Sequence, residues 1–205
     1  MRFVDFQAKL RDFPVFSLDE IRLFDPSFHR QRLTEWQAKG YIRKVVRGYY
    51  VLSAAPITEH SLFAVANKIY VPSYVSLESA LAEYRLIPEA AYTVTSVTTR
   101  KTASFATPLA RFSYRTIRPS FFRGYRILRT AGYPALIASP ERAVFDFLYL
   151  RPDIAAAEDL AALRIDRSAA AELIDPKTMA SLEAMDLSQS FRRRLRLFRE
   201  YLDHA

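Results

Sequence analysis

The hydrophobic and polar positions of residues 17–50 predict two short helices followed by a β-hairpin. Ser17 stands three residues before Glu20 and just ahead of an apolar pair, which is the spacing of a capping box at a helix start. Asp25 directly precedes Pro26, and this pair favours the start of a second helix, with the Asp as N-cap. We therefore expect one helix after Ser17 and another that begins at Pro26.

The second predicted helix has an apolar face and a polar face. Leu33 and Trp36 are three residues apart on the apolar face, and His29 falls on the same face, so we expect all three to lie at the core or its boundary. Gly40 follows and favours a left-handed helix end. The opposite arc is polar, with Ser27 near the positive end of the helix, and consists of Arg30, Gln31, Thr34 and Glu35.

Residues 41–52 form two β-rich runs around Arg47-Gly48, a pattern typical of a hairpin. Two helices, a glycine stop and a basic hairpin predict a winged helix-turn-helix domain over residues 1–53. Its polar helix arc is suited to the base edges of the major groove, and its hairpin to the DNA backbone. The expected groove contacts are Ser27, Arg30, Gln31 and Thr34, and the expected backbone contacts are Arg43, Lys44 and Arg47. The alternative is a protein-docking module with a solvated basic face.

A boundary near 53–56 separates this domain from a second one, which we expect over residues 56–205. Helical spacing is found at 58–69, 76–84 and 139–150, and strand patterns at 92–97, 111–117, 125–128 and 135–138. Beyond about residue 150 the chain is rich in Ala, with helix starts at Asp175-Pro176 and Ser188. The prediction is an α+β protein with a winged-helix N-terminus, a mixed middle domain with a small sheet, and a helical C-terminus. The last helix carries an apolar stripe of Phe191, Leu195, Phe198 and Leu202, which we expect to pack in the core.

Two segments of the second domain resemble a known family. The run YVSLESALAEYRLIPEAAYTVTSVTTRKT at 74–102 and the run ASPERAVFDFLYL at 138–150 resemble the signature segments of the abortive-infection antitoxins of the AbiE type, often labelled transcriptional regulators of viral defence systems. The RGYY at 47–50 fits the same family. The resemblance covers residues 15–150. The family usually has a glycine before Leu86, whereas this chain has Arg85, a departure expected to alter the turn after the preceding helix.

The resemblance implies a type IV toxin–antitoxin system. Such antitoxins have an N-terminal winged helix that binds inverted repeats in double-stranded DNA and represses its own operon. Their remaining part counteracts a nucleotidyltransferase-like toxin encoded beside them, and no catalytic residue carries over. The alternatives are a stand-alone winged-helix regulator without a toxin, and a protein-docking adaptor.

Composition agrees with an anionic partner. The chain has 30 Lys and Arg against 22 Asp and Glu, a net charge of +8, and half of its residues are hydrophobic. It has no cysteine, which excludes disulfides and thiolate metal sites. The first 13 residues contain two Asp and no long apolar run, so we expect neither a signal peptide nor a membrane span, and a cytoplasmic protein.

The positive charge is unevenly distributed along the chain. Residues 1–52 have a balance of +4, residues 90–140 have eight basic and no acidic side chains, and residues 141–190 have a balance of −5. The basic middle stretch predicts a surface for a partner or an extended DNA contact, and the alternative is a solvated sheet edge protected from aggregation. Its candidate residues are Arg100, Lys101, Arg115, Arg118, Arg123 and Arg126.

The sequence contains no pattern typical of a catalytic, metal or cofactor site. The three histidines are scattered without ligand spacing, and the four glycines do not cluster into a phosphate-binding loop. Glu141 and Asp146 are five residues apart on one predicted helix and do not face together. We expect Asp146 to pair with an Arg. The prediction is a protein that is not an enzyme and needs neither a cofactor nor a metal.

Overall fold

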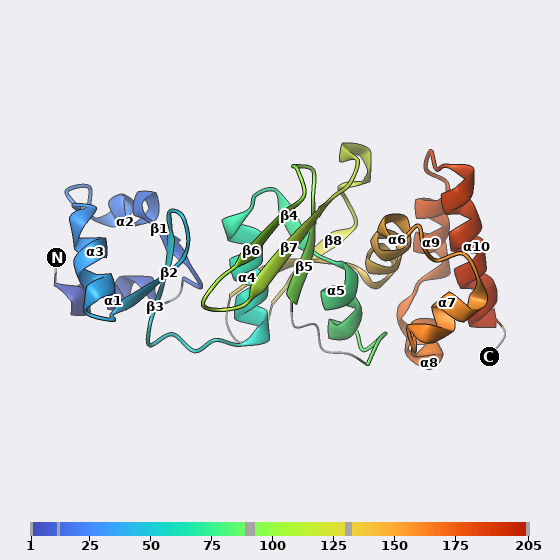
Figure 1. Ribbon diagram of the computed structural model, residues 1–205, viewed down its shortest axis with the longest axis horizontal. Coiled ribbons are helices and arrows are strands. Elements are labelled where there is room, and N and C mark those ends of the chain that lie inside the picture. Colours follow the sequence, from blue (N-terminus) through green and yellow to red (C-terminus); the bar gives the residue numbers. More distant parts are fainter. Residues whose placement is uncertain (1, 12, 89–92, 130–132, 204–205) are drawn as a thin grey trace.

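The computed structural model describes residues 2–11, 13–88, 93–129 and 133–203 of the 205-residue chain. Within these ranges the protein is a mixed α+β structure with ten α-helices, one short 3₁₀ helix, and β-sheets of three and six strands. Three parts follow one another along the long axis: the head (2–53), the body (57–150) and the tail (151–203) (Figure 1). Over the described ranges, no helix has the length and apolar character needed to cross a bilayer.

The head combines three helices with an antiparallel sheet of order β1-β3-β2. Its elements are α1 (Phe3–Leu10), β1 (Phe16–Ser17), α2 (Leu18–Phe24), α3 (Gln31–Ala38), β2 (Ile42–Val46) and β3 (Tyr49–Leu52). The predicted capping box starts α2, because Ser17 Oγ accepts from the Glu20 amide and the Glu20 carboxylate accepts from the Ser17 amide. Helix α1 was not predicted, although Phe3, Phe6 and Leu10 have helical spacing.

The small sheet of the head is covered on both faces. On one face, Ile42 and Tyr50 join a core that includes Phe6, Leu33 and Trp36 from the helices. On the other face, Val45 and Val51 belong to the larger core of the body, as does Val15 just before β1. The head therefore packs against the body through its sheet, while its helices lie on the far side (Figure 1).

The body is built on a sheet of order β6-β7-β5-β4-β9-β8, in which β4–β9 and β5–β7 pair in parallel. Its elements are α4 (Glu59–Ile69), β4 (Ser73–Val75), α5 (Leu77–Glu83), β5 (Thr93–Thr98), β6 (Ala103–Ala106), β7 (Arg111–Thr116), the 3₁₀ helix η1 (Pro119–Phe121), β8 (Tyr125–Leu128), β9 (Ala135–Ala138) and α6 (Pro140–Leu150). The four strands expected from the sequence are present, and the first residue expected for the earliest of them, Tyr92, lies outside the described residues. Strands β4 and β6 were not predicted.

Helices cover the two faces of this sheet. Helix α4 packs on the face that bears Tyr114, whose hydroxyl donates to the carbonyl of Ala66 at 2.7 Å. Helix α6 packs on the opposite face, where the Tyr74 hydroxyl donates to Asp146 at 2.9 Å, and α5 packs against α6 (Figure 1). The sheet therefore forms the middle layer of the body.

The tail consists of four helices, which are α7 (Ala157–Ala162), α8 (Arg167–Leu173), α9 (Pro176–Glu183) and α10 (Gln189–Asp203). Two of them, α9 and α10, pack on α6, while the other two pack on α10. Asp175 caps α9 through the amides of Lys177 and Thr178, as its sequence predicts. The predicted core packing of the stripe on α10 is confirmed: Phe191, Leu195 and Phe198 are buried, and Leu202 is half-buried against the same core.

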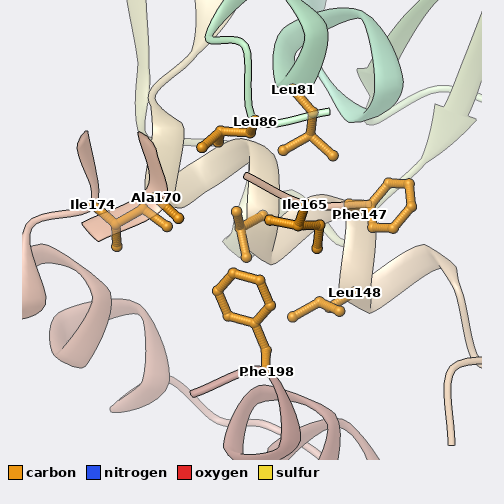
Figure 2. Close-up of a pocket in the computed structure, with 9 residues that line it drawn as sticks. Leu81, Leu86, Phe147, Leu148, Ile165, Ala170, Ile174 and Phe198 are labelled. Carbon is orange, nitrogen blue, oxygen red and sulfur yellow. The ribbon is translucent and has the colours of Figure 1, made fainter. Parts of the chain in front are cut away.

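Phe198 points from α10 toward side chains of the body and of α8 (Figure 2). The residues around it enclose a cavity of about 10 Å³ whose lining is entirely apolar. Such a space is near the lower limit for one water molecule and offers it no polar partner, so we expect it to stay dry. Around Phe198, the contact between tail and body is thus apolar.

The turn after α5 has an unusual backbone at Arg85. This residue adopts φ +57°, in the left-handed region that favours glycine. The amide of Leu86 donates to the carbonyl of Leu81 at 2.8 Å, which closes the turn. The chain therefore makes this turn with an arginine at a position where a glycine would be unstrained.

Candidate nucleic-acid interface

Helix α3 is held in the head by its apolar side. Leu33 and Trp36 are 1% and 5% exposed, and Trp36 contacts the rings of Phe6 and Phe28 at centroid distances of 4.4 and 5.4 Å. Burial of two such side chains stabilises the helix position by about 1.5–3 kcal/mol each. The predicted inner positions of Leu33 and Trp36 are confirmed.

Because the apolar side is buried, the opposite arc of α3 faces solvent. Gln31 and Thr34 are exposed one turn apart, and Arg30 is exposed at the residue before the helix. Glu35 is exposed beside them. The structure thus brings Arg30, Gln31 and Thr34 together at the N-terminal half of one short helix.

The predicted start of this helix was wrong. Helix α3 begins at Gln31, and Asp25 and Pro26 instead begin a turn, which the hydrogen bond from the Phe28 amide to the Asp25 carbonyl closes at 2.9 Å. Ser27 lies exposed in this turn and donates to the Asp25 carboxylate at 2.8 Å. It therefore precedes the helix by several residues instead of lying at its first turn.

The expected core position of His29 was also wrong. His29 is exposed, whereas its neighbour Phe28 is 2% exposed and packs against Trp36. The turn places the larger apolar ring inward, because burying a phenyl ring removes more apolar surface from water than burying an imidazole does.

The basic residues of the hairpin lie on different faces. Lys44 and Arg47 are exposed, and Arg47 stands beside Gly48, which has φ +90° in the turn. Arg43 pairs with Val51, which is buried in the body core, so Arg43 lies on the body side of the sheet. It is half-buried, and its Nε has no hydrogen-bond partner among the described residues. The hairpin therefore presents Lys44 and Arg47 to solvent and Arg43 only in part.

Arg32 is a further cation on α3 that the sequence pattern did not single out. Its guanidinium lies over the ring of Trp36 at 5.4 Å and over that of Phe28 at 6.0 Å. The side chain is half-buried between the exposed arc and the core. Its spacing from Trp36, four residues along a helix, was the available signal.

The basic residues of the body form two groups. Arg100 and Lys101 follow β5, and the hydroxyl of Thr116 donates to the Arg100 carbonyl at 2.7 Å, which places them near Arg115 and Arg118 at the end of β7. The second group stands at β8, on the far side of three intervening strands. Strands are about 4.8 Å apart, so β7 and β8 are separated by roughly 19 Å. The second group comprises Arg123 and Arg126.

Two of these arginines are fixed by aromatic rings. The guanidinium of Arg100 lies 4.2 Å from the ring centre of Tyr70 and donates to the Val71 carbonyl at 3.1 Å. That of Arg126 lies 5.1 Å from the ring centre of Tyr84. Both residues remain exposed. Cation–π contact therefore holds these charges in place at the surface.

Behind the sheet, a buried polar network surrounds Asp146. Arg142 forms an ion pair with Asp146, as expected from the sequence, and both side chains are fully buried. The hydroxyls of Tyr74 and Ser76 each donate to the same carboxylate oxygen at 2.9 Å. Gly124 packs against this arginine with φ +77°, and a Cβ there would lie 3.1 Å from Arg142 Cδ.

Burial also shifts the proton affinities of this network. Desolvation raises the pKa of the Asp146 carboxyl above its usual value, although the adjacent guanidinium opposes the shift. Desolvation likewise raises the pKa of the Tyr74 hydroxyl far above its usual range. All of the groups are enclosed, so the network fixes α6 to β4 and presents no side chain to a substrate.

No group of three or more His, Asp or Glu side chains is arranged to hold a metal ion within the described ranges. His60 is paired with Glu83 at 3.1 Å, His29 stands alone on the surface, and His204 lies outside the described residues. Glu141 accepts from Ser139 and from the amide of Asp175, which ties α6 to the start of α9. The acidic side chains of α6 thus have structural partners.

The chain has no match among models of known protein families, and none among curated protein sequences. The two segments at 74–102 and 138–150 nevertheless meet in the fold. The first includes β4 from its second residue, α5 and β5, and the second forms the end of β9 and α6. They are joined around Asp146 by the hydroxyls of Tyr74 and Ser76.

Proposed function

We propose that the head is a winged helix-turn-helix that binds double-stranded DNA. The observation that carries this proposal is the arrangement of α3, whose apolar side is locked in the head core while Arg30, Gln31 and Thr34 face solvent. A helix with that arc free can enter the major groove. The order α1-β1-α2-α3-β2-β3, with α2 and α3 joined by a short turn, also favours a helix-turn-helix followed by a wing.

The exposed side chains have complementary roles in such a complex. Gln31 can bond both edge atoms of an adenine, and Thr34 can contact a thymine methyl group or a base-edge acceptor. Arg30 can bond a guanine or a phosphate. Lys44 and Arg47 contact phosphates from the hairpin, whereas half-buried Arg43 contributes less.

We further propose that the chain is an antitoxin that represses its own operon and counteracts a nucleotidyltransferase-like toxin encoded beside it. The resemblance of residues 74–102 and 138–150 to the AbiE-type antitoxins supports this part of the proposal. Those segments pack together around a buried polar network, so a shared sequence pattern there has a structural basis.

A gel-shift titration with the DNA upstream of the chain's own coding sequence tests the DNA-binding proposal. The triple variant Arg30→Ala/Gln31→Ala/Arg47→Ala should lose sequence-specific binding. The loss of each base contact should cost about 1–3 kcal/mol of binding free energy. The control Lys177→Ala/Arg196→Ala removes the same positive charge from exposed positions of the tail and should bind as the parent does.

Salt dependence separates the two kinds of contact. Arg47→Ala should reduce the slope of log K against log salt by about 1, because one phosphate contact is lost. Gln31→Ala should leave the slope unchanged and relax the sequence preference. Equal binding by the triple variant and the parent would overturn the assignment of this surface. The toxin part is tested separately, by relief of growth arrest when the chain is expressed with the neighbouring toxin.

A further inference from the structure

The outer edge of β8 presents unpaired backbone groups. Strand β8 stands at one end of the body sheet, and among the described strands it pairs only with β9. The amide of Ser139 donates to the carbonyl of Gly124 at 2.9 Å, which makes these two opposite residues a hydrogen-bonded pair. Hydrogen-bonded and non-bonded pairs alternate along an antiparallel ladder. Tyr125 and Ile127 therefore direct their N–H and C=O groups away from β9.

The hydrogen bonds of the residue opposite Ile127 on β9 support this assignment of bonded and non-bonded pairs. Leu136 lies opposite Ile127, and its amide and carbonyl are bound by the side chain of Asn67 at 2.6 and 3.2 Å. These groups point toward α4 and not toward β8. The Ile127–Leu136 pair is therefore non-bonded within the ladder, and the backbone groups of Ile127 are available at the outer edge.

The side chains at this edge are apolar and exposed. Tyr125 and Ile127 are two residues apart and lie on the same face of the strand, with exposed fractions of 40% and 53%. Tyr125 is held in place, because its ring stacks on that of Tyr74 with a centroid distance of 4.9 Å. Exposed edge strands usually avoid apolar side chains, since these invite pairing with another strand. An exposed apolar pair at an open edge indicates a docking site.

The charge around the edge selects the kind of partner. Arg123, Arg126 and Arg129 are exposed along and beside β8, and no described acidic side chain forms an ion pair with them. Pairing of two copies through this edge would place arginines against arginines, which destabilises a strand pair. The opposite sheet edge, β6, contains only uncharged residues, so the β6 edge of a second copy would offer these arginines no acidic partner. The edge of β8 therefore favours an acidic partner over a second copy of this chain.

We propose that the outer edge of β8 binds an extended, acidic segment of another protein as an added strand. The fitting segment has the pattern acidic-x-apolar-x-apolar-x-acidic. Its apolar side chains lie against Tyr125 and Ile127, and its carboxylates face Arg123 and Arg129, which lie just before and just after the strand. This surface is in the body, so the proposal does not depend on DNA binding by the head.

Fluorescence anisotropy with the full chain and labelled peptides tests the proposal. The peptide Glu-Thr-Val-Thr-Val-Thr-Glu should bind saturably, and the peptide with Lys in place of both Glu should bind about tenfold more weakly or not at all. N-methylation of the peptide at one set of alternate residues should abolish binding, whereas N-methylation at the other set should not. Only one set of peptide amides faces β8. Hydrogen exchange at the amides of Tyr125 and Ile127 should slow when the acidic peptide is bound.

Substitutions in the chain give a second set of outcomes. Ile127→Pro removes an outward N–H that the β8–β9 ladder does not use, so the chain should keep its unfolding midpoint and lose the peptide. Ile127→Val keeps the N–H and the apolar side chain and should bind normally. Arg123→Glu/Arg129→Glu should reverse the preference toward the Lys peptide.

Three results would overturn the proposal. The first is equal binding of the two N-methylated forms of the acidic peptide, which would indicate charge attraction without strand pairing. The second is displacement of the acidic peptide from the parent chain by double-stranded DNA, together with loss of DNA binding in Arg123→Glu/Arg129→Glu but not in Arg30→Ala/Gln31→Ala/Arg47→Ala, which would make this edge a nucleic-acid contact. The third is a dimer in light scattering that Ile127→Pro dissociates, which would make the occupant a second copy.

Discussion

At the scale of single residues, Arg85 tests how much strain the fold tolerates for one turn. Its φ of +57° costs an L-amino acid about 1 kcal/mol relative to the right-handed region. Its side chain is exposed, so replacing it removes no core packing. The sequence already indicates this site, because the resembling antitoxins usually have a glycine there, and the structure supplies the physical reason.

Arg85→Gly should therefore raise the free energy of unfolding by up to about 1 kcal/mol, since relief of strain exceeds the added flexibility of the unfolded chain. The matched control Arg85→Ala keeps the strain and should change stability by less than about 0.5 kcal/mol. Urea unfolding midpoints at equal slope measure both. A glycine variant no more stable than the alanine variant would mean that the turn relaxes at little cost.

At the scale of elements, sequence prediction succeeded where the signal is local. Ser17, Ser139 and Asp175 each cap a helix with hydrogen bonds to residues three positions on or fewer, and all three helix starts were anticipated. The strands with alternating patterns were also found. The short strand β4, which lies at the centre of the sheet, carries no such pattern because all three of its residues are buried.

The candidate site shows the limit of local signals. Asp25-Pro26 has the same chemistry as Asp175-Pro176, yet it begins a turn, because burial of Phe28 against Trp36 determines the path of the chain. The prediction that His29 lies on the inner face of this helix was wrong for the same reason. The exposure of Arg30, Gln31 and Thr34 was predicted from Leu33 and Trp36 alone, since those two residues fix the phase of the helix from Gln31 onward. Arg43 and Lys44 lie on opposite faces because adjacent strand residues alternate, but burial of the Arg43 face depends on contact with the body, which no local pattern encodes.

The element most dependent on distant packing is α10. Phe198 is 2% exposed and meets α5, α6 and α8 around the small dry cavity (Figure 2). Phe198→Ala should destabilise the chain by about 3–5 kcal/mol, because the enlarged cavity cannot fill with water. Arg196→Ala, exposed on the same helix, should change the free energy of unfolding by less than about 0.5 kcal/mol. Equal urea midpoints for the two variants would show that the tail contributes no stability to the body.

At the scale of the whole molecule, the head is held against the body by Lys68 of α4. Its ammonium group pairs with Glu20 of α2 and donates to the carbonyl of Val15 at 2.8 Å, and it lies 5.1 Å from the ring centre of Phe13. Tyr133 adds a second polar tie, donating to the carbonyl of Arg11 at 2.7 Å. The apolar contact of Val15, Val45 and Val51 with the body core completes the interface. These contacts give the head a fixed orientation, so the strand partner proposed for the body and the DNA proposed for the head would be held at a set distance.

Lys68→Met keeps most of the apolar stem and removes both polar contacts to the head. The two partners of the ion pair are about one-quarter exposed, with side-chain fractions of 26% and 25%, so solvent screens their attraction and the loss should be about 1 kcal/mol. A double-mutant cycle with Glu20→Gln, which keeps the helix cap, should give a coupling energy of about 0.5–1 kcal/mol. Hydrogen exchange should accelerate at residues 13–17 in Lys68→Met and stay unchanged within α6. The control Lys177→Met, at an exposed lysine of the tail, should alter neither region. A coupling energy of zero together with unchanged exchange would mean that the apolar contact alone orients the head, and in that case Val51→Ala, and not Lys68→Met, would loosen it.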